Sequence, residues 1–153
     1  MSITTCDFNY YESFIKHQGA GHIELDAGAF GMLLTTDTYV PAADTHEFVD
    51  DITNELTGNG YARQILTGVT YTDVGPNGKH RFWSNNPQWT ASGGSLTAHY
   101  WALYYNTPAT DATRHLIAYG FLDVTAGGTD VVALDTETLT FLVAATGHFT
   151  VGG

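Results

Sequence analysis

The side chains that could do chemistry in this sequence are, first of all, its histidines, at positions 17, 22, 46, 80, 99, 115 and 148. Histidine ligands of a metal ion often repeat at i, i+2 on a strand or at i, i+4 on a helix, and no pair here has either spacing. We therefore expect isolated histidines that form cross-strand hydrogen bonds, and no metal site. A meeting of two of them in the folded chain stays open.

A run of carboxylates at residues 44–51 is the second candidate. Asp44, Glu47, Asp50 and Asp51 could supply oxygen ligands to a hard cation such as calcium. The EF-hand pattern Asp-x-[Asp/Asn]-x-[Asp/Asn]-Gly is missing, and Phe48 in the middle of the run predicts that one side docks on the core. We expect a solvated acidic loop, with a calcium site as the alternative left open.

Motifs of nucleophilic, metal-dependent or nucleotide chemistry are absent from the sequence. It contains no Gly-x-Ser-x-Gly, no His-Glu-x-x-His and no Gly-Lys-[Ser/Thr]. Residues 19–21 (Gly-Ala-Gly) and 58–60 (Gly-Asn-Gly) lack the third glycine of a dinucleotide-binding loop, so they predict turns. The expectation is a protein without catalytic residues or a cofactor.

The charge balance excludes two classes of partner. The chain has 5 Lys+Arg against 16 Asp+Glu, a formal net charge of -11. Binding to a nucleic-acid backbone or to an anionic membrane surface requires clustered basic residues, and here they are scattered. No secretory signal or apolar stretch long enough to span a bilayer is evident, so we expect synthesis in the cytoplasm.

Cysteine usage and size bound the fold further. Cys6 is the only cysteine, so it cannot form an intrachain disulfide, and a buried or incidental thiol is expected. With 153 residues and 43% hydrophobic content, the chain predicts a single domain, residues 1–153, with a sizeable core.

The elements that must position these residues are mostly strands. Residues 8–18 predict one helix, capped by Asp7, ended by Gly19, and packed through a stripe of Phe8, Tyr11, Phe14 and Ile15. Short strands are expected at 22–25, 30–36, 61–72, 79–83, 96–105, 115–122, 131–134, 138–144 and 148–151. This spacing favours a mainly β protein, an antiparallel β-sandwich or jelly roll with one short N-terminal helix.

The strand at 96–105 is the most informative, because residues 100–105 (Tyr-Trp-Ala-Leu-Tyr-Tyr) are apolar or aromatic on both faces. Such a strand must be covered on both sides. The N-terminal helix and a second subunit are both candidates for the cover. Because Tyr and Trp are enriched at interface hot spots, the candidate interface residues are Tyr100, Trp101, Tyr104, Tyr105, Tyr11 and Trp83.

Several motifs, in order, resemble a family of small virion structural proteins of tailed bacteriophages. The resemblance starts at Met32-Leu33-Leu34-Thr35-Thr36-Asp37-Thr38-Tyr39-Val40-Pro41, continues at Asp44–Phe48 and Asp50–Tyr61, and extends to Trp89-Thr90, Leu96–Tyr104, Thr107–Asp111 and Leu116–Tyr119. It covers roughly residues 8–151. The tail departs from the family pattern, because no Trp follows Thr140-Phe141-Leu142, which leaves the packing of the last hairpin open.

The resemblance implies a head decoration (cement) protein on the capsid surface of the virion. It implies a β-sandwich that binds the major capsid protein, and a homotrimer at local three-fold positions. A structural component of the tail, neck or fibre is a second hypothesis for the function. A carbohydrate-binding β-sandwich, with Trp83, Trp89 and Trp101 as stacking platforms, is a third.

Overall fold

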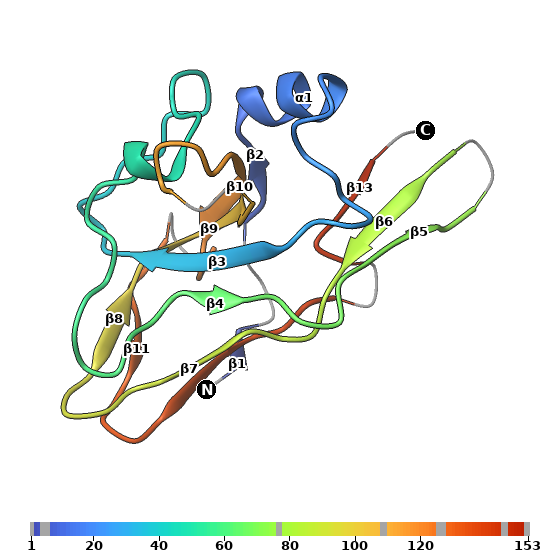
Figure 1. Cartoon of the computed structure of the whole chain (residues 1–153). Helices are drawn as coiled ribbons and strands as arrows, with labels where there is room; N and C mark the ends of the chain where they lie inside the picture. The colour runs from blue at the N-terminus through green and yellow to red at the C-terminus, as the bar shows by residue number, and fades with distance from the viewer. Residues whose placement is uncertain are drawn as a thin grey trace.

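The computed structural model describes residues 2–3, 7–75, 78–107, 110–124, 128–144 and 147–151. The protein is mainly β, with several antiparallel sheets and one short helix, as the strand spacing predicts. The sheets form a sandwich-like arrangement (Figure 1), and their strand orders do not confirm a jelly roll. The prediction for Cys6 falls outside the described residues.

A five-stranded sheet occupies the centre of the molecule. Its order is β2 (Asn9–Tyr10), β10 (Leu116–Phe121), β9 (Tyr100–Tyr105), β3 (Phe30–Thr35) and β4 (Gln64–Ile65). Strand β9 pairs antiparallel with both β3 and β10. Both β3 and β9 consist almost entirely of apolar and aromatic residues, the composition expected of strands buried on both faces.

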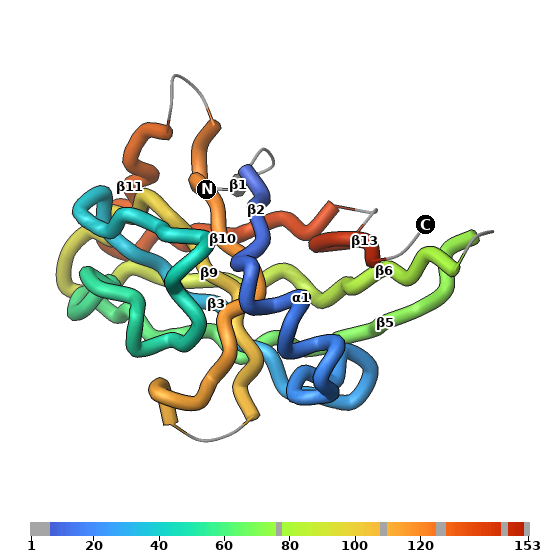
Figure 2. Tube along the Cα trace, turned by 90° about the horizontal axis from the view of Figure 1, so that it is seen from above, coloured from blue at the N-terminus to red at the C-terminus, as the bar shows by residue number. Residues whose placement is uncertain are grey.

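Three smaller sheets complete the fold. One contains β1 (Ser2–Ile3), β12 (Thr138–Phe141) and β7 (Gln88–Thr90); a second pairs β11 (Val131–Ala133) with β8 (Leu96–Ala98); the third contains β13 (Phe149–Val151), β6 (His80–Trp83) and β5 (Thr70–Asp73). The β5–β6 ribbon extends away from the body in both views (Figures 1 and 2). One hydrophobic cluster joins all four sheets through residues such as Phe82, Trp89, Leu96 and Trp101.

The predicted strand 96–105 is two strands, β8 and β9, which belong to different sheets. The chain changes sheet at His99, whose backbone N–H donates to Thr35 and whose carbonyl accepts from Leu122. The physical reason is the change of pattern: residues 96–98 alternate and pair with β11, whereas 100–105 are apolar on both faces and enter the central sheet.

The N-terminal helix starts later than predicted: α1 spans Glu12–Gly19 and not 8–18. Asn9 and Tyr10 form β2 instead, because they pair with Tyr119 and Ala118 of β10. Pairing with an existing strand satisfies the backbone groups that an additional helical turn would have satisfied.

The predicted cap and part of the predicted stripe are not observed. Asp7 does not cap α1, since its carboxylate accepts hydrogen bonds from the Phe8 backbone N–H and from Asn9 Nδ2. Tyr11 holds the N-cap position. Phe14 is buried as predicted, whereas Ile15 is 59% exposed and contributes nothing to the core.

Both faces of β9 are covered by the chain itself. One face carries Trp101, Leu103 and Tyr105, which belong to the large cluster shared with the smaller sheets. The other carries Ala102 and Tyr104, which pack with a second cluster formed by Tyr11, Leu33, Val49 and Leu116. The sequence left two candidates for this cover, the N-terminal helix and a second subunit. In the structure this face is covered from within the chain, by the start of α1 together with the long segment that contains the 3-10 turn η1 (Val49–Asp51).

Candidate functional site

Most of the predicted interface residues lie inside the molecule. Tyr11 and Trp101 have no exposed surface, Tyr104 is 1% exposed and Tyr105 6%. These four side chains cannot form a surface for a partner, because they already fill the two faces of the central sheet. Tyr100 and Trp83 are half-buried and remain accessible.

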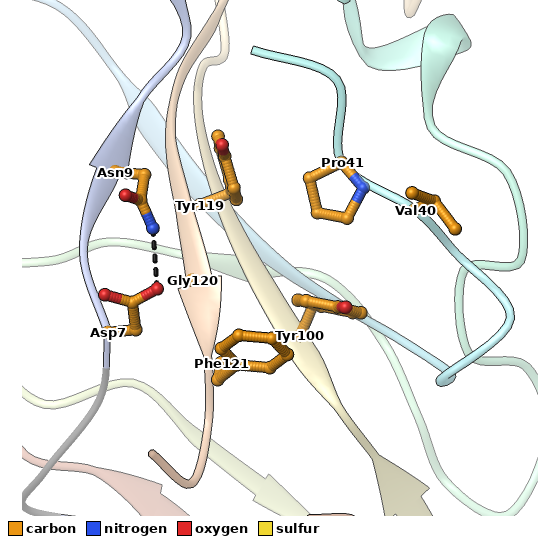
Figure 3. Close-up of a pocket in the computed structure, with 8 residues that line it drawn as sticks. All are labelled: Asp7, Asn9, Val40, Pro41, Tyr100, Tyr119, Gly120 and Phe121. Atoms are coloured by element: carbon orange, nitrogen blue, oxygen red, sulfur yellow. Dashed lines mark hydrogen bonds between the residues drawn. The ribbon is translucent and has the colours of Figure 1, made fainter. Parts of the chain in front are cut away.

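Tyr100 lines a pocket of about 270 Å³ where β2, β9 and β10 meet the segment around residue 40 (Figure 3). We call it the Tyr100 groove; its lining consists of Asp7, Asn9, Val40, Pro41, Tyr100, Tyr119, Gly120 and Phe121. The Tyr100 and Phe121 rings stack with centroids 4.7 Å apart and an interplanar angle of 29°. Val40, at 74% exposure, is an apolar side chain open to solvent in this lining.

The groove combines aromatic faces with a few polar groups. Burial raises the pKa of the Tyr100 and Tyr119 hydroxyls, so both remain protonated hydrogen-bond donors at neutral pH. Asp7 Oδ2 accepts from Asn9 Nδ2 at 2.7 Å beside Tyr119, on the side of the groove away from Val40 and Pro41 (Figure 3). Such a surface can stack against an apolar or ring-shaped group and fix its orientation by hydrogen bonds.

Gly120 allows β2 to approach β10 at this groove. A Cβ atom at position 120 would lie 1.8 Å from the backbone oxygen of Asp7. The contact is with backbone, so no side-chain rotation would relieve it. The wall that carries Asp7 and Asn9 therefore depends on a glycine here.

An ion-pair network joins two loops on the side of the sheet that carries Tyr104. Arg63 binds Glu55 through Nε and Nη2 (2.8 and 2.6 Å) and Asp111 through Nη1 and Nη2 (2.7 and 2.9 Å). Arg114 Nη1 adds a bond of 2.8 Å to Asp111. The hydrogen bonds from Arg63, and to a lesser extent the one from Arg114, lower the pKa of Asp111. The Arg63 guanidinium also lies 5.7 Å above the centre of the Tyr104 ring.

Several of the basic residues form ion pairs within the chain. Arg63 and Arg114 belong to the network above, and Lys16 Nζ lies 3.6 Å from Glu47. The sixteen acidic residues far outnumber the carboxylates that these pairs use. The outer surface is consequently strongly negative.

Three histidines that are distant in sequence come together. His17 near the end of α1, His22 in the following loop and His115 just before β10 each place one ligand atom within 4.8 Å of the others. His17 and His115 are buried, whereas His22 is exposed. Burial, together with the neighbouring His17 and His22 rings, lowers the pKa of His115 to about 4. Among the described residues this is the group that could hold a metal ion.

The spacing rules applied to the sequence did not find this histidine cluster. Its members come from a helix, a loop and a strand end, and the Phe48–His115 bridge that places the third depends on tertiary structure. One signal was present: four residues separate His17 from His22, within the three-to-five spacing of paired histidine ligands.

The acidic run 44–51 is divided between exposed and internally bonded carboxylates. Asp44 and Asp50 are exposed, as expected of a solvated loop. Asp51 Oδ2 instead accepts from the Glu47 and Phe48 backbone N–H groups at 2.7 and 2.9 Å. Val49, and not Phe48, is the buried anchor. In the described part of the chain these carboxylates do not converge as a group of ligands.

No helix in the described ranges has the length and apolar character needed to cross a bilayer. Comparison of the chain with protein-family models, with curated proteins and with solved structures gave no match. The features of this acidic, mainly β protein that bear on its function are an accessible aromatic groove and a three-histidine cluster.

Proposed function

We propose that this chain is a structural protein of a tailed-bacteriophage virion, and that it decorates the head by binding the major capsid protein as a homotrimer. The observation that carries the proposal is the ordered set of motifs between residues 32 and 119 that resembles such proteins. In the fold, the Arg63 bonds to Glu55 and Asp111 connect two of the motif-bearing segments, and the bridge from Phe48 to His115 brings a third next to the segment that begins at Leu116.

The charge of the chain supports a protein added from solution to a finished lattice. Free copies carrying a net charge of -11 repel one another, which keeps them soluble before assembly. A positively charged surface on the shell would attract them and orient their approach. Binding to the shell should therefore weaken as the salt concentration rises.

The Tyr100 groove is the contact surface that we assign to the shell. It is accessible, in contrast to Trp101, Tyr104 and Tyr105, and aromatic side chains of this kind dominate the energetics of many interfaces. Val40 lies in its lining and is exposed, so a substitution there changes the surface without disturbing the core.

A binding assay with undecorated heads of the parent phage tests the proposal. The wild-type chain should add in many copies per head, and Val40→Asp should reduce the number bound by at least about tenfold, since it places a charge in an apolar contact. Ile65→Asp is the matched control, because Ile65 is also exposed (52%) but lies on β4. Absence of wild-type binding at saturating concentration, or only a few copies in purified virions, would overturn the assignment to the head.

Location on the particle separates head decoration from a tail, neck or fibre role. Labelled antibodies against the chain, viewed by electron microscopy, should mark the head uniformly. Label confined to the tail or neck would contradict the proposed location on the head and favour a tail, neck or fibre component.

A carbohydrate-binding module is the second candidate function, and the groove is the observation that favours it. Of the tryptophans expected to stack on sugars, Trp89 and Trp101 are buried, at 1% and 0% exposure. Tyr100 and Tyr119, together with the neighbouring Asp7 and Asn9, offer the aromatic and polar groups that a sugar ring would need. Glycan-array binding that is lost in Tyr100→Ala would favour this function over shell binding.

A further inference from the structure

The three-histidine cluster is assembled by a turn and a bridge that the fold fixes independently of each other. The backbone N–H of His22 donates to the carbonyl of His17 at 2.9 Å, so the chain turns back directly after α1. His115 pairs with Phe48 in an isolated bridge, and its ring stacks on that of His17 with centroids 3.9 Å apart. The cluster thus joins α1 to the start of β10.

A hydrogen bond to Glu47 fixes the orientation of the His17 ring. Its Nε2 donates to the Glu47 carboxylate, which only accepts, so in the neutral imidazole Nδ1 is the nitrogen with the free lone pair. Nδ1 points at Nδ1 of His22 at a distance of 2.9 Å. A carboxylate that accepts the far N–H of a histidine is the arrangement that orients histidine ligands in many metal sites and raises their basicity.

His115 supplies an unsatisfied nitrogen. Its Nδ1 is buried and has no hydrogen-bond partner among the described residues. Leaving a buried polar atom unpaired costs about 1–3 kcal/mol in ordinary cases, so such an atom in a cluster of imidazoles calls for an explanation. A ligand that accepts electron pairs from several nitrogens at once would supply one.

From this geometry we infer that His17, His22 and His115 bind a divalent transition-metal ion, zinc in the first instance, and that Glu47 positions His17. Imidazole nitrogens suit zinc, nickel, copper and iron, whereas calcium and magnesium prefer oxygen. The inference is independent of the proposed virion role, because it depends only on these four side chains.

The distances suit zinc after a small adjustment. Ligand nitrogens at 2.0–2.1 Å from a tetrahedral zinc ion lie roughly 3.3 Å apart, between the 2.9 Å that separates the two Nδ1 atoms and the 4.8 Å limit of the cluster. His22 is exposed on a loop, so its ring can turn and carry its proton on Nε2 toward water. The carboxylate of Glu47 also offsets part of the positive charge that a zinc ion would add. The nearby ammonium group of Lys16 acts in the other direction, because it repels the ion.

The fourth coordination position faces an open pocket. A pocket of about 550 Å³ is lined by the three histidines and by Phe48, Tyr105, Thr107 and Thr113. Three protein ligands and one position open to solvent distinguish this arrangement from a closed structural site with four protein ligands. Water or a small anion would complete the coordination.

Calorimetric titration of the chelator-treated full chain with zinc chloride tests the inference. We expect one zinc ion per chain, and a loss of affinity in His22→Ala that exceeds the roughly 10–100-fold typical of losing an outer partner. His22 is exposed, so this variant should fold. His80→Ala is the matched control, because His80 stacks on Tyr71 in the β5–β6 ribbon, outside the cluster, and should leave the affinity unchanged.

Thermal unfolding gives a second readout. Zinc at about 100 times its dissociation constant should raise the Tm of the wild type by about 5–10 °C, and not that of His22→Ala. Absence of saturable binding, or equal affinity in the wild type and His22→Ala, would overturn the site.

Glu47→Gln tests the positioning role separately. Glutamine keeps an acceptor for the His17 Nε2 proton but removes the charge, so zinc affinity should fall by about 10–100-fold while the Tm of the metal-free protein stays near that of the wild type. Wild-type zinc affinity in this variant would show that Glu47 does not position His17.

Discussion

The two faces of the central sheet are stabilised in different ways. On one face Trp101, Leu103 and Ile117 join a continuous apolar cluster that reaches all the smaller sheets. On the other, the apolar cluster is small, and long loops are attached through polar side chains: the Arg63 ion pairs and a chain of bonds from Tyr11 through Tyr39 to His46.

The difference separates the source of stability from the source of specificity. Apolar burial contributes about 25 cal/mol for each Å² removed from water and depends little on direction. Polar attachments contribute about 0.5–1.5 kcal/mol per hydrogen bond but require particular partners in particular positions. Tyr100, Tyr119 and Glu47, which take part in the two proposed binding sites, belong to the polar face or its loops, where side chains can be accessible without exposing the core.

Removal of Trp101 should produce the largest effect. Trp101→Ala empties a site with no exposed surface in the apolar cluster, so the free energy of unfolding should fall by about 3–5 kcal/mol in urea denaturation. Ile15→Ala, at an exposed position, serves as the control and should change it by less than about 0.5 kcal/mol. A loss below about 1 kcal/mol for Trp101→Ala would contradict the conclusion that apolar burial stabilises this face of the sheet.

The ion-pair network on the polar face should come next. Arg63→Met removes the shared guanidinium and leaves Glu55 with the Tyr61 hydroxyl and Asp111 with Arg114, and partial exposure of the charged groups reduces the cost to about 2 kcal/mol. Because the pKa of Asp111 is lowered in the folded state, its contribution is present above the ordinary carboxyl pKa and is lost as the pH falls through the folded value.

A comparison with Arg63→Lys separates the effect of the bidentate geometry of Arg63 from that of its charge. Lysine keeps the charge but cannot bind two carboxylates in the bidentate manner of Arg63, so this variant should be intermediate. Equal stabilities of Arg63→Met and the wild type at neutral pH would mean that the network does not hold the loops.

The apolar face also has a titratable residue, His148, whose protonation should destabilise the fold. Burial lowers the pKa of His148 to about 4, and its Nε2 is 2.8 Å from Ser84 Oγ. A lowered pKa in a base means that the unfolded chain takes up the proton first, so stability is complete above about pH 6.5 and is lost as the pH falls toward 4.

The measurement is the free energy of unfolding of wild type and His148→Gln at pH 7 and pH 5. His148 is half-buried, so the wild type should lose about 1–2 kcal/mol more than the variant over this interval. Parallel losses in both proteins would contradict the assigned shift.

The smallest effect is expected for a single hydrogen bond on the polar face. Tyr11→Phe removes the 2.8 Å bond between the Tyr11 and Tyr39 hydroxyls at almost unchanged volume, which should cost about 1 kcal/mol. In a double-mutant cycle with Tyr39→Phe, the two losses should not add, since both remove the Tyr11–Tyr39 bond and only Tyr39→Phe also removes the bond to His46. Additive losses would show that the hydroxyl chain does not act as a unit.

The parts of the fold that follow from short-range pattern were predictable from the sequence. Alternating and β-branched runs located most strands, and the doubly apolar run 100–105 correctly required a cover on both faces. The helix start was wrong because Asn9 and Tyr10 pair with β10, a tertiary interaction that overrides the helical pattern of residues 8–11.

The candidate site was less predictable, because its residues are brought together by contacts between distant segments. Aromatic residues that resemble an interface in sequence, such as Trp101 and Tyr104, are core residues once the loops of the polar face cover them. His115 reaches His17 through contacts between distant segments, among them its bridge to Phe48, and no local pattern encodes these contacts.

The strand order has a consequence for the rate of folding. Strands β2, β3, β7 and β8 find their partners in β10, β9, β12 and β11, far along the chain, and few pairs are local hairpins. Closing long loops before any contact is formed makes such topologies slow, on the order of milliseconds to seconds. Two sheets include β12 and β13, residues 138–151, so neither sheet can form in full before these residues have been synthesised.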